Sequence, residues 1–499
     1  MFSSSDAALL DREPRYDDIT CSLASVNRLP AGVISETREL VAMARRFSDE
    51  VVRPRALELD RMKHEDPDYL PWDLVEEANR WGFYTMFIPK LFGGQGKNMP
   101  GLSYVLEEIG SACTAISNLI GVHYLGIGTL CGSWNGRVMN KVMREVAEGE
   151  RTGKPCLVSL AITEPGAGTD VEEVDLIGRA KVTCHAEKVP GGYRLNGRKI
   201  FISSGHLSTW HMTIAYGDLE NPAETTVMLA VRNGMEGFSF GRQEHKMGQK
   251  GCPASELIFE DCFVPDELVC FDSVQADKLS KPMKAITNQL LDYVLSASRA
   301  GVGAFGTGVA RGAYEEALRF SQETEVGGKL LINHEWAQVL LAEMYKNVAM
   351  ARLSYIETNY ANGMYGLFKL LHYKPIFYCL RYTPQTFIDR FLEPFLEKDF
   401  VTWIFRKIYF DWQKPEQGER TSGWASLSKF ASTDAGVKNS QLACELMGGA
   451  GVRTDQMAEK HLRDSKLLQI YEGTNQLNRL NLFKCLIGRS APQSKVFED

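Results

Sequence analysis

The hydrophobic and polar positions of the chain change period twice, and the first part is helical. From "SETRELVAMARRFSDEVVRPRALELDR" to about residue 155, apolar residues such as Leu40, Ala44 and Phe47 recur at helical spacing. Ser35 is the expected N-cap of the first helix, with acidic residues in the turn after it. The pattern predicts a helical domain over residues 35–155, preceded by an irregular leader over residues 1–34.

Residues 156–275 follow a different period, in which apolar and polar positions alternate. In "AKVTCHAEKVPGGYRLNGRKIFIS" two turn signals, Pro190-Gly191-Gly192 and Asn196-Gly197, interrupt the alternating stretches. The segments "TVMLAVRN", "FSFGRQE" and "ELIFEDCFVP" continue the strand-like pattern. These features predict a compact β domain, a barrel or a sandwich.

Long helical patterns return over residues 276–486 and are broken by turns at "ETEVGG", "GGAGVRTD" and "YEGT". The order predicts an α+β protein with an N-terminal α-helical domain, a middle β domain and a C-terminal helical domain. Residues 487–499 are expected to be a short tail.

One part of the C-terminal region, at about residues 355–420, is expected to be an insertion. Seventeen aromatic residues lie between Tyr355 and Trp412, and Lys369 to Lys414 contains eight Lys/Arg against five Asp/Glu. One interpretation is an extra helical layer with a buried aromatic face. The other is a lid over a long substrate channel, or a patch that contacts a membrane or a partner.

Composition and charge narrow the class of protein. The 499 residues have a net charge of −7, which argues against nucleic acid as the main partner. The eleven cysteines form no CxxC pair and no HExxH occurs, so neither a disulfide framework nor a metal site is predicted. The acidic N-terminus lacks an apolar signal core, and we noted no uncharged apolar run of membrane-spanning length. We therefore expect a cytoplasmic protein.

Two motifs in the β domain carry residues suited to a flat cofactor. In "LAITEPGAGTDVEE" the run from Pro165 to Gly168 lets backbone groups approach a ligand, with Thr163 and Thr169 on either side. In "RKIFISSGHLSTWH" Phe201 and Ser203 lie on the same face of a strand. A plain β-turn and an ordinary amphipathic strand are the alternative interpretations.

Two motifs in the C-terminal region are helix ends. "ELMGGAGVRTD" stops a helical pattern at Gly448-Gly449. "LLQIYEGTNQLNRLN" places Glu472 on a turn between two helical patterns, beside Tyr471. A carboxylate among apolar residues gains basicity from desolvation and suits a proton-abstracting base. The alternatives are a simple helix C-cap and a helix N-terminal acid that the macrodipole favours.

Together the four motifs resemble the acyl-CoA dehydrogenase family of flavoenzymes. "ITEPGAGTD" and "IYEGTNQLNR" are similar to its two most recognisable motifs, and the resemblance spans about residues 36–486. It implies an N-terminal helical domain, a middle β domain and a C-terminal four-helix bundle, with FAD as the cofactor. It also implies a homotetramer or homodimer, with a hetero-oligomer as the alternative.

The resemblance assigns roles residue by residue. Glu472 matches the catalytic base; the position that holds this base in some other members is Ser298 here. Substrate-side positions are matched by Thr169, Ser298, Arg299, Tyr471 and Gly473. FAD contacts are matched by Leu160, Ile162, Thr163, Gly168, Thr169, Phe201, Ser203, Glu445, Gly449, Thr474 and Gln476.

The implied chemistry is the α,β-dehydrogenation of an acyl-CoA thioester. The Glu472 backbone N–H and the flavin ribityl chain would bind the thioester carbonyl, which lowers the pKa of the α-proton. Glu472 would take that proton while the β-hydride passes to flavin N5, and the 2-enoyl-CoA would be released. An electron-transfer flavoprotein would then accept the electrons.

Three positions depart from the family pattern. Thr324 stands where an arginine is usual, and Glu335 and Glu445 stand where glutamines are usual. In the family these residues meet the FAD of a neighbouring subunit. The nearby Lys329 is a candidate compensating charge. Either this chain needs a partner subunit, or the carboxylates point elsewhere at no cost. An acyl-CoA oxidase and a non-catalytic subunit of a heteromeric dehydrogenase remain the alternatives, and the acyl group stays open.

Overall fold

The computed structural model describes residues 30, 32–488, 491 and 493–498. Most of the predicted leader, and parts of the predicted tail, lie outside these residues. The first described helix, α3, spans Gly32–Phe47, so it begins before the expected N-cap. The Ser35 hydroxyl instead donates to the carbonyl of Gly32 one turn earlier (3.1 Å). The N-cap prediction at Ser35 was wrong because the helical backbone already includes that residue.

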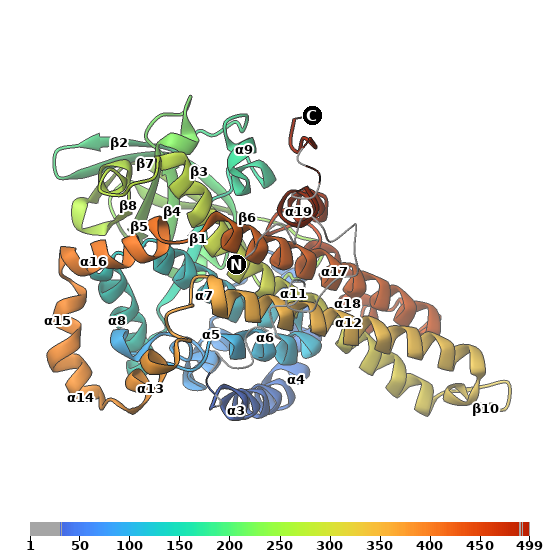
Figure 1. Cartoon of the computed structure of the whole chain (residues 1–499). Coiled ribbons are helices and arrows are strands. Elements are labelled where there is room, and N and C mark those ends of the chain that lie inside the picture. The colour runs from blue at the N-terminus through green and yellow to red at the C-terminus, as the bar shows by residue number, and fades with distance from the viewer. Residues whose placement is uncertain (1–29, 31, 489–490, 492, 499) are drawn as a thin grey trace.

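Helices make up the N-terminal part of the fold, as predicted (Figure 1). They are α3, α4 (Arg53–Glu65), α5 (Trp72–Arg80), α6 (Pro100–Ala112), α7 (Thr114–Gly132) and α8 (Gly136–Thr152). Helix α7 is long and apolar enough to cross a membrane, contrary to our reading of the sequence, but 89% of that stretch is buried inside the fold. It is the central helix of this part, and its burial explains its lack of charge.

The middle part is a mixed eight-stranded sheet, with strand order β6-β7-β3-β2-β4-β5-β8 and with β1 beside β4. Its strands are β1 (Leu157–Ala161), β2 (His185–Val189), β3 (Gly192–Ser203), β4 (Ser208–Tyr216), β5 (Thr226–Arg232), β6 (Phe238–Gln243), β7 (Ala254–Pro265) and β8 (Val269–Phe271). In Figure 1 the sheet lies above the helices of the N-terminal part.

One of the two predicted turns in this sheet is wrong. The chain does turn at Gly191, between β2 and β3. Asn196-Gly197, however, lies inside β3, where the pairing with β7 shifts between Leu195 and Gly197. A Cβ on Gly197 would lie 2.7 Å from Cys184 Cα, so the glycine allows a bulge next to a neighbouring backbone. The bulge bends the strand without ending it.

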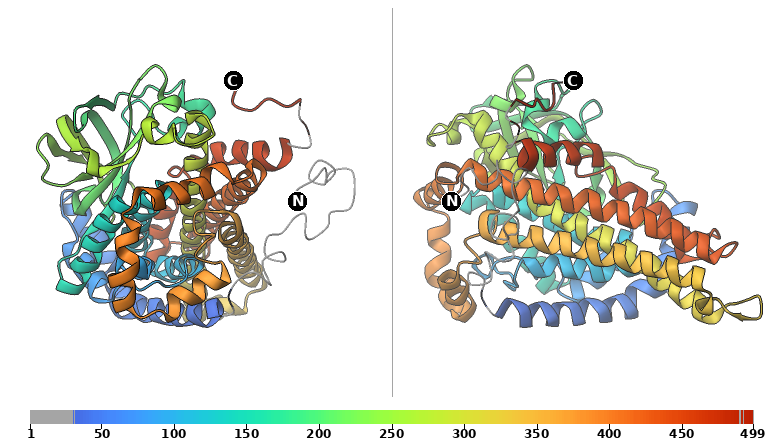
Figure 2. Two further views of the ribbon diagram at one scale, coloured as in Figure 1. Left: turned by 60° about the vertical axis from the view of Figure 1, so that its left-hand side comes forward. Right: turned by 45° about the vertical axis from the view of Figure 1, so that its right-hand side comes forward.

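Long antiparallel helices form the C-terminal part (Figures 1 and 2). The long ones are α11 (Met283–Glu323), α12 (Glu335–Tyr365) and α17 (Pro415–Met447), and the shorter α18 (Met457–Leu468) and α19 (Asn475–Leu482) follow them. Glycines on α11 allow close packing: a Cβ on Gly306 would lie 2.6 Å from the backbone of Ser432 on α17. Helices α11 and α6 also pack together, and one hydrophobic core joins all three parts of the chain.

The aromatic-rich segment folds into short helices beside α8, at the left edge of Figure 1. They are α13 (Lys374–Tyr382), α14 (Gln385–Phe387), α15 (Glu393–Leu396) and α16 (Asp399–Arg406). Arg144 of α8 forms ion pairs with Asp389 (2.8 Å) and Glu393 (2.6 Å), and Trp134 stacks on Tyr409. The segment therefore packs as an extra layer, as one interpretation expected.

Many aromatic side chains of this layer nevertheless face outward. Those exposed are Tyr373, Tyr378, Tyr382, Phe387, Phe391, Phe395, Phe400, Trp403 and Trp412. We call these nine residues the exposed aromatic face. The buried aromatic face that one interpretation predicted exists only at the two ends of the layer, where Phe377, Tyr409 and Phe410 are buried.

Candidate active site

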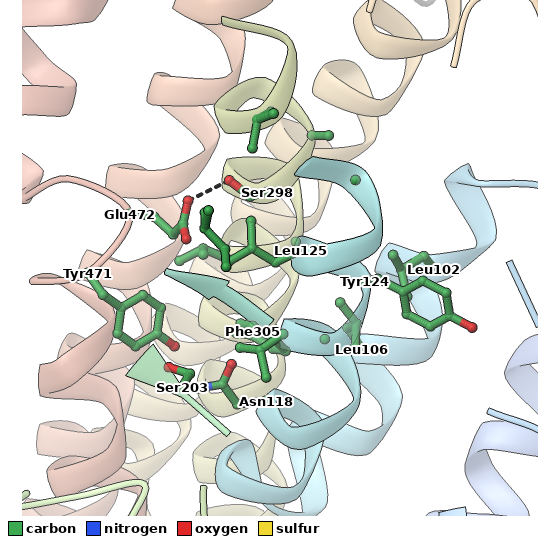
Figure 3. Close-up of a pocket in the computed structure, with 18 of the residues that line it drawn as sticks. Leu102, Leu106, Asn118, Tyr124, Leu125, Ser203, Ser298, Phe305, Tyr471 and Glu472 are labelled. Atoms are coloured by element: carbon green, nitrogen blue, oxygen red, sulfur yellow. Dashed lines mark hydrogen bonds between the residues drawn. The ribbon is translucent and has the colours of Figure 1, made fainter. Parts of the chain in front are cut away.

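A cavity of about 350 Å³ lies where the sheet meets the two sets of helices. Helices α6 and α7 form one wall, α11 and α12 another, and β1 and β3 a third. Apolar side chains dominate the part drawn in Figure 3, among them Leu102, Leu106, Leu125 and Phe305. Glu472, Tyr471, Ser298 and Ser203 also line the cavity. Residues that lie far apart in the sequence thus meet at one cavity.

Glu472 occupies the turn between α18 and α19 in a left-handed backbone conformation, with φ +56°. Gly473 follows with φ +73°. The Thr474 side chain then caps α19 by accepting a hydrogen bond from the Leu477 N–H (3.3 Å). Two successive left-handed residues reverse the chain between the helices, and the carboxylate of Glu472 reaches into the cavity.

Neighbours on α11 hold Glu472 by its side chain and its backbone. The Ser298 hydroxyl donates to Glu472 Oε2 (2.5 Å), as the dashed line in Figure 3 marks. Arg299 Nε donates to the Glu472 carbonyl oxygen (3.3 Å). Burial raises the pKa of Glu472, and the hydrogen bond from Ser298 and the positive charge of Arg299 oppose that rise. The carboxylate is therefore both oriented and made more basic than a surface glutamate.

A second carboxylate, Glu172, lies next to this turn. Burial, and after it the charge of Glu472, raise the pKa of Glu172 to about 7. Arg299 Nη2 lies 3.5 Å from Glu172 Oε2. A Cβ on Gly473 would lie 3.0 Å from the same oxygen. Two carboxyl groups thus share one arginine, and like charges this close do not both ionise freely.

Lys429 on α17 supports the same turn from inside the protein. Its side chain is fully buried and Nζ donates to the Gly473 carbonyl oxygen and to Asn475 Oδ1, each at 2.7 Å. Burial lowers the pKa of Lys429 to about 7. We did not predict Glu172 or Lys429 from the sequence. Glu172 follows the predicted Thr169 by three residues, which is the one sequence signal that points to either of them.

Most of the residues predicted to contact FAD meet at one wall of the cavity. The lining includes Leu160, Ile162, Thr163, Gly168, Thr169, Phe201 and Ser203. Phe201 lies at a break in the β3–β7 pairing with φ +58° and is 54% exposed. The hydroxyls of Thr163, Thr169 and Ser203 donate to no other residue that the structure describes. An exposed ring beside three available hydroxyls fits a flat heteroaromatic cofactor with a phosphate tail.

Other predicted site residues lie outside this cavity. Glu445 and Gly449 are exposed at the end of α17, and Gln476 is exposed on α19. Thr474 serves as the cap of α19. Arg299 and Gly473 do not line the cavity, but each lies next to a residue that does. Arg299 contacts Glu472, and Gly473 lies beside Glu172. A single chain therefore assembles the β-domain motifs with Glu472, and leaves the "ELMGGAGVRTD" motif apart from them.

The three departures noted in the sequence gather at the far end of the helical bundle. Thr324 ends α11, and a small hairpin of β9 (Glu325–Val326) and β10 (Lys329–Leu330) leads to α12. A separate hydrophobic cluster packs the ends of α11, α12 and α17 together, at the right of Figure 1. Glu335 and Glu445 are exposed there and form no ion pair with any described residue. In a single chain these carboxylates face solvent.

Family models match most of the described chain. The model "Acyl-CoA dehydrogenase, N-terminal domain" matches residues 35–150, and "Acyl-CoA dehydrogenase, middle domain" matches residues 159–262. The model "Acyl-CoA dehydrogenase, C-terminal domain" matches residues 289–361 and 409–487. Residues 362–408 lie between the last two stretches, and they include the short helices of the aromatic-rich layer.

Relatives and solved structures agree with these matches. A Mycobacterium tuberculosis protein named "Probable acyl-CoA dehydrogenase FadE25" is 25% identical over 453 residues, 91% of this chain and 95% of the relative. Butyryl-CoA dehydrogenase from Megasphaera elsdenii has a similar fold (TM-score 0.68, 20% identity, 91% of this chain and 98% of that one). A glutaryl-CoA dehydrogenase from Mycobacterium smegmatis in complex with FADH2 is also similar (TM-score 0.65, 18% identity, 91% and 94%).

Proposed function

Because the chain belongs to the acyl-CoA dehydrogenase family, we propose that it oxidises an acyl-CoA thioester to the 2-enoyl-CoA with FAD as its cofactor. Glu472 is the base that removes the α-proton. The observation that carries the proposal is the position of its carboxylate: it lines the same cavity as Thr163, Phe201 and Ser203. A base and a surface for a flat cofactor then face one another across a space that an acyl chain can enter.

The environment of Glu472 supports its role as a base. A general base works best when its pKa approaches the working pH, and burial raises the pKa of this carboxyl. The hydrogen bond from Ser298 keeps the carboxylate aimed into the cavity. The backbone N–H of Glu472 donates to no residue within the described chain. We assign this N–H to the thioester carbonyl oxygen, where it stabilises the charge that develops when the α-proton leaves.

The chain offers suitable contacts for FAD. The hydroxyls of Thr163 and Ser203 are placed to bond the ring system, Phe201 to pack on it, and Thr169 to bond the diphosphate. FAD, when bound, supplies the acceptor for the β-hydride. Tyr471 closes the wall between the ring site and Glu472, and its hydroxyl is held by Gln249 (3.3 Å). The substrate is thereby kept between the base and the ring.

The exposed positions of Glu445 and Gly449 favour an oligomer. If these residues contact FAD as the family resemblance implies, the cofactor belongs to another subunit, because they lie away from this chain's own cavity. We propose a homotetramer or homodimer. Thr324, Glu335 and Glu445 favour a hetero-oligomer instead, since two added carboxylates would repel a neighbouring diphosphate.

The family uses electron-transfer flavoproteins as acceptors, and we propose the same acceptor here. The cytoplasmic location expected from the sequence stays part of this proposal. A membrane contact, if this protein makes one, is assigned to the exposed aromatic face, where aromatic rings lie beside Lys374 and Arg390.

The test is a visible absorption spectrum of the purified full-length protein with FAD quantified per protomer. We expect about one flavin per protomer that bleaches anaerobically when acyl-CoA thioesters are added. Rapid hydrogen peroxide formation in air during turnover would instead identify an oxidase. A flavin-free chain that gains FAD only with a second subunit would make it part of a heteromeric enzyme, and a flavin that no acyl-CoA reduces would refute the proposal.

A further inference from the structure

Four polar residues interrupt the apolar wall of the cavity. Ser103 comes from α6, Asn359 and Asn362 come from α12, and His372 follows α12 in the aromatic-rich layer. We call these four residues the polar subsite. Ser103, Asn362 and His372 are 4%, 6% and 4% exposed, and Asn359 is partly buried. Polar side chains this well buried normally find hydrogen-bond partners.

Three of these side chains keep polar atoms without a partner. Asn362 Nδ2 donates to the Ser296 carbonyl oxygen (2.9 Å), which fixes the amide and leaves Oδ1 unpaired. The Ser103 hydroxyl donates to Asn359 Oδ1 (3.2 Å), and Asn359 Nδ2 has no partner. Neither ring nitrogen of His372 forms a hydrogen bond of ordinary geometry with a described residue, although the Gly363 carbonyl is close enough to act on the ring. These donor and acceptor atoms are buried in the cavity wall, and no described residue uses them.

The polar subsite carries no positive charge. Burial lowers the pKa of His372 to about 4, although the Gly363 carbonyl opposes this shift. The imidazole is therefore neutral at neutral pH, with one donor and one acceptor nitrogen. Within the described chain no lysine or arginine lines the cavity. The cations nearest His372 lie in the adjoining cavity and already have partners: Lys97 and Arg381 pair with Glu36, and Lys90 donates to the Thr383 carbonyl oxygen. A carboxylate would therefore be buried here without a counter-ion of its own, which is unfavourable, whereas a neutral group can both accept and donate.

The polar subsite and Glu472 lie in different parts of the cavity. His372 and Met99 also line a small adjoining cavity between Lys90 and Arg381. Glu472 and Ile162 line another one, toward Thr226 and Leu290. The two small cavities share no lining residue. Leucine, valine and phenylalanine side chains make up much of the remaining wall. An acyl chain that presents its α-carbon to Glu472 can thus extend along apolar surface toward the polar atoms.

We propose that the acyl group carries a neutral hydrogen-bonding substituent, a hydroxyl or an amide, that pairs with Asn359, Asn362 and His372. This inference rests on the proposed function, because it assigns the far end of the same substrate site. A plain alkyl chain would bury the three side chains without partners, and sites built to bond a polar group discriminate strongly against analogues that lack it. His372 lies between the stretches matched by the family model, so the insertion supplies this part of the specificity.

The experiment compares three length series with the flavin-loaded wild-type protein: straight-chain acyl-CoAs, ω-hydroxyacyl-CoAs and ω-carboxyacyl-CoAs. Anaerobic flavin bleaching gives the affinity of each compound, and turnover with an artificial electron acceptor gives kcat/KM. At the chain length that reaches the polar subsite, we expect the hydroxyacyl compound to exceed the plain one by about tenfold or more in kcat/KM. The carboxyacyl compound should bind more weakly than the hydroxyacyl compound.

Two variants link this preference to the residues. His372→Phe and Asn362→Leu should each reduce the hydroxyacyl-to-alkyl ratio to near one, with the ratio and not the absolute rate as the readout. Leu102→Met is the matched control, since it alters the apolar wall without touching a hydrogen bond, and it should retain the wild-type ratio. The wild-type comparison stands even where a variant fails to fold.

The outcomes separate this inference from the proposed function. If plain acyl-CoAs bleach the flavin at least as well as hydroxyacyl-CoAs at every chain length, the inference of a polar substituent is wrong. The dehydrogenase assignment then remains intact. A preference for the carboxyacyl series overturns the neutral assignment. Flavin that none of the three series bleaches overturns both.

Discussion

Ser298 donates a hydrogen bond to the carboxylate of Glu472, and its neighbour Arg299 donates one to the Glu472 backbone. Two successive residues of α11 thus hold both ends of the same glutamate. The sequence resemblance places the base of some other family members at the position of Ser298. Here that position holds a hydroxyl that is hydrogen-bonded to the Glu472 carboxylate. The relationship makes the ionisation of Glu472 depend on a residue 174 positions away.

Replacing Glu472 with glutamine should abolish turnover while the protein keeps its FAD. Glutamine has the same shape but cannot accept the α-proton, and loss of a general base costs about 10²- to 10⁴-fold in rate. Steady-state turnover and the flavin spectrum measure the two effects. Glu220→Gln, at an exposed loop position, is the control and should behave as wild type. Retention of most activity by Glu472→Gln would refute the catalytic assignment.

Removing the Ser298 hydroxyl should shift the pH dependence of the reaction. The hydrogen bond stabilises the ionised form of Glu472 and opposes the rise of its pKa, so Ser298→Ala should raise that pKa further. A hydrogen bond to a charged group contributes about 1.5–3 kcal/mol, which corresponds to about one to two pH units. The acidic limb of the kcat/KM profile should move to higher pH by that amount. Ser298→Thr, which keeps the hydroxyl, should stay near the wild-type profile, and superimposable profiles for the alanine variant would contradict the prediction.

Glu172 should make the folded protein less stable as the pH rises. Its pKa is raised from 4.5 to about 7, so the folded state holds a proton that the unfolded state releases. The corresponding stabilisation is complete below about pH 4.5 and is lost as the pH rises through about 7. The Glu172→Gln variant has no carboxyl group to titrate at this position, so it should not lose this stability. Between pH 5 and pH 8 its free energy of unfolding should rise by on the order of 2 kcal/mol relative to that of the wild type.

Chemical denaturation at the two pH values measures this change. Glu187→Gln, on the exposed face of β2, controls for the loss of one negative charge and should follow the wild-type pH dependence. Equal pH dependence in Glu172→Gln and wild type would show that the carboxyl group is not protonated in the folded protein.

Gly473→Ala should destabilise the turn that carries the base. The backbone at Gly473 has φ +73°, and an added Cβ would lie 2.8 Å from Leu477 Cδ2 and 3.0 Å from Glu172 Oε2. The left-handed conformation alone costs an alanine about 1–2 kcal/mol, and relief of the contacts would displace Glu472. We expect lower stability in thermal unfolding together with a reduced kcat. Gly178→Ala has open space around its Cβ and an ordinary φ, so an equal loss there would contradict this explanation.

The sequence was sufficient for much of the fold because its periods are unambiguous. The alternating stretches became β2, β3, β5, β6 and β7, and the stop at Gly448 matched the end of α17. Asn196-Gly197 misled because a hairpin turn and a bulge use the same residues, and only the pairing of β3 with β7 distinguishes them. The N-cap prediction at Ser35 failed because serine also occurs within the first turn of a helix, where its hydroxyl donates to a backbone carbonyl.

The candidate site was predictable only where a local motif carried it. Glu472 and Thr163 lie in recognisable stretches, and both line the cavity. Lys429 and His372 carry no local signal, and Glu172 carries only its place three residues after Thr169, because their roles depend on long-range packing. In the sequence Lys429 looks like any helical lysine, and only the fold places it against Gly473. His372 meets its neighbours only because the aromatic-rich layer packs near α6 and α12.

The segment between the matched stretches contributes one part of the cavity wall. Glu472, Ser298 and Thr163 come from stretches that the family models match, whereas Phe368 and His372 come from the segment between the matched stretches. On the proposed function, substitutions in that segment would change one part of the acyl-binding wall and leave Glu472 in place. Ser103 and Asn359 complete the polar subsite from matched stretches, so the segment would adjust a selectivity that the matched helices also carry.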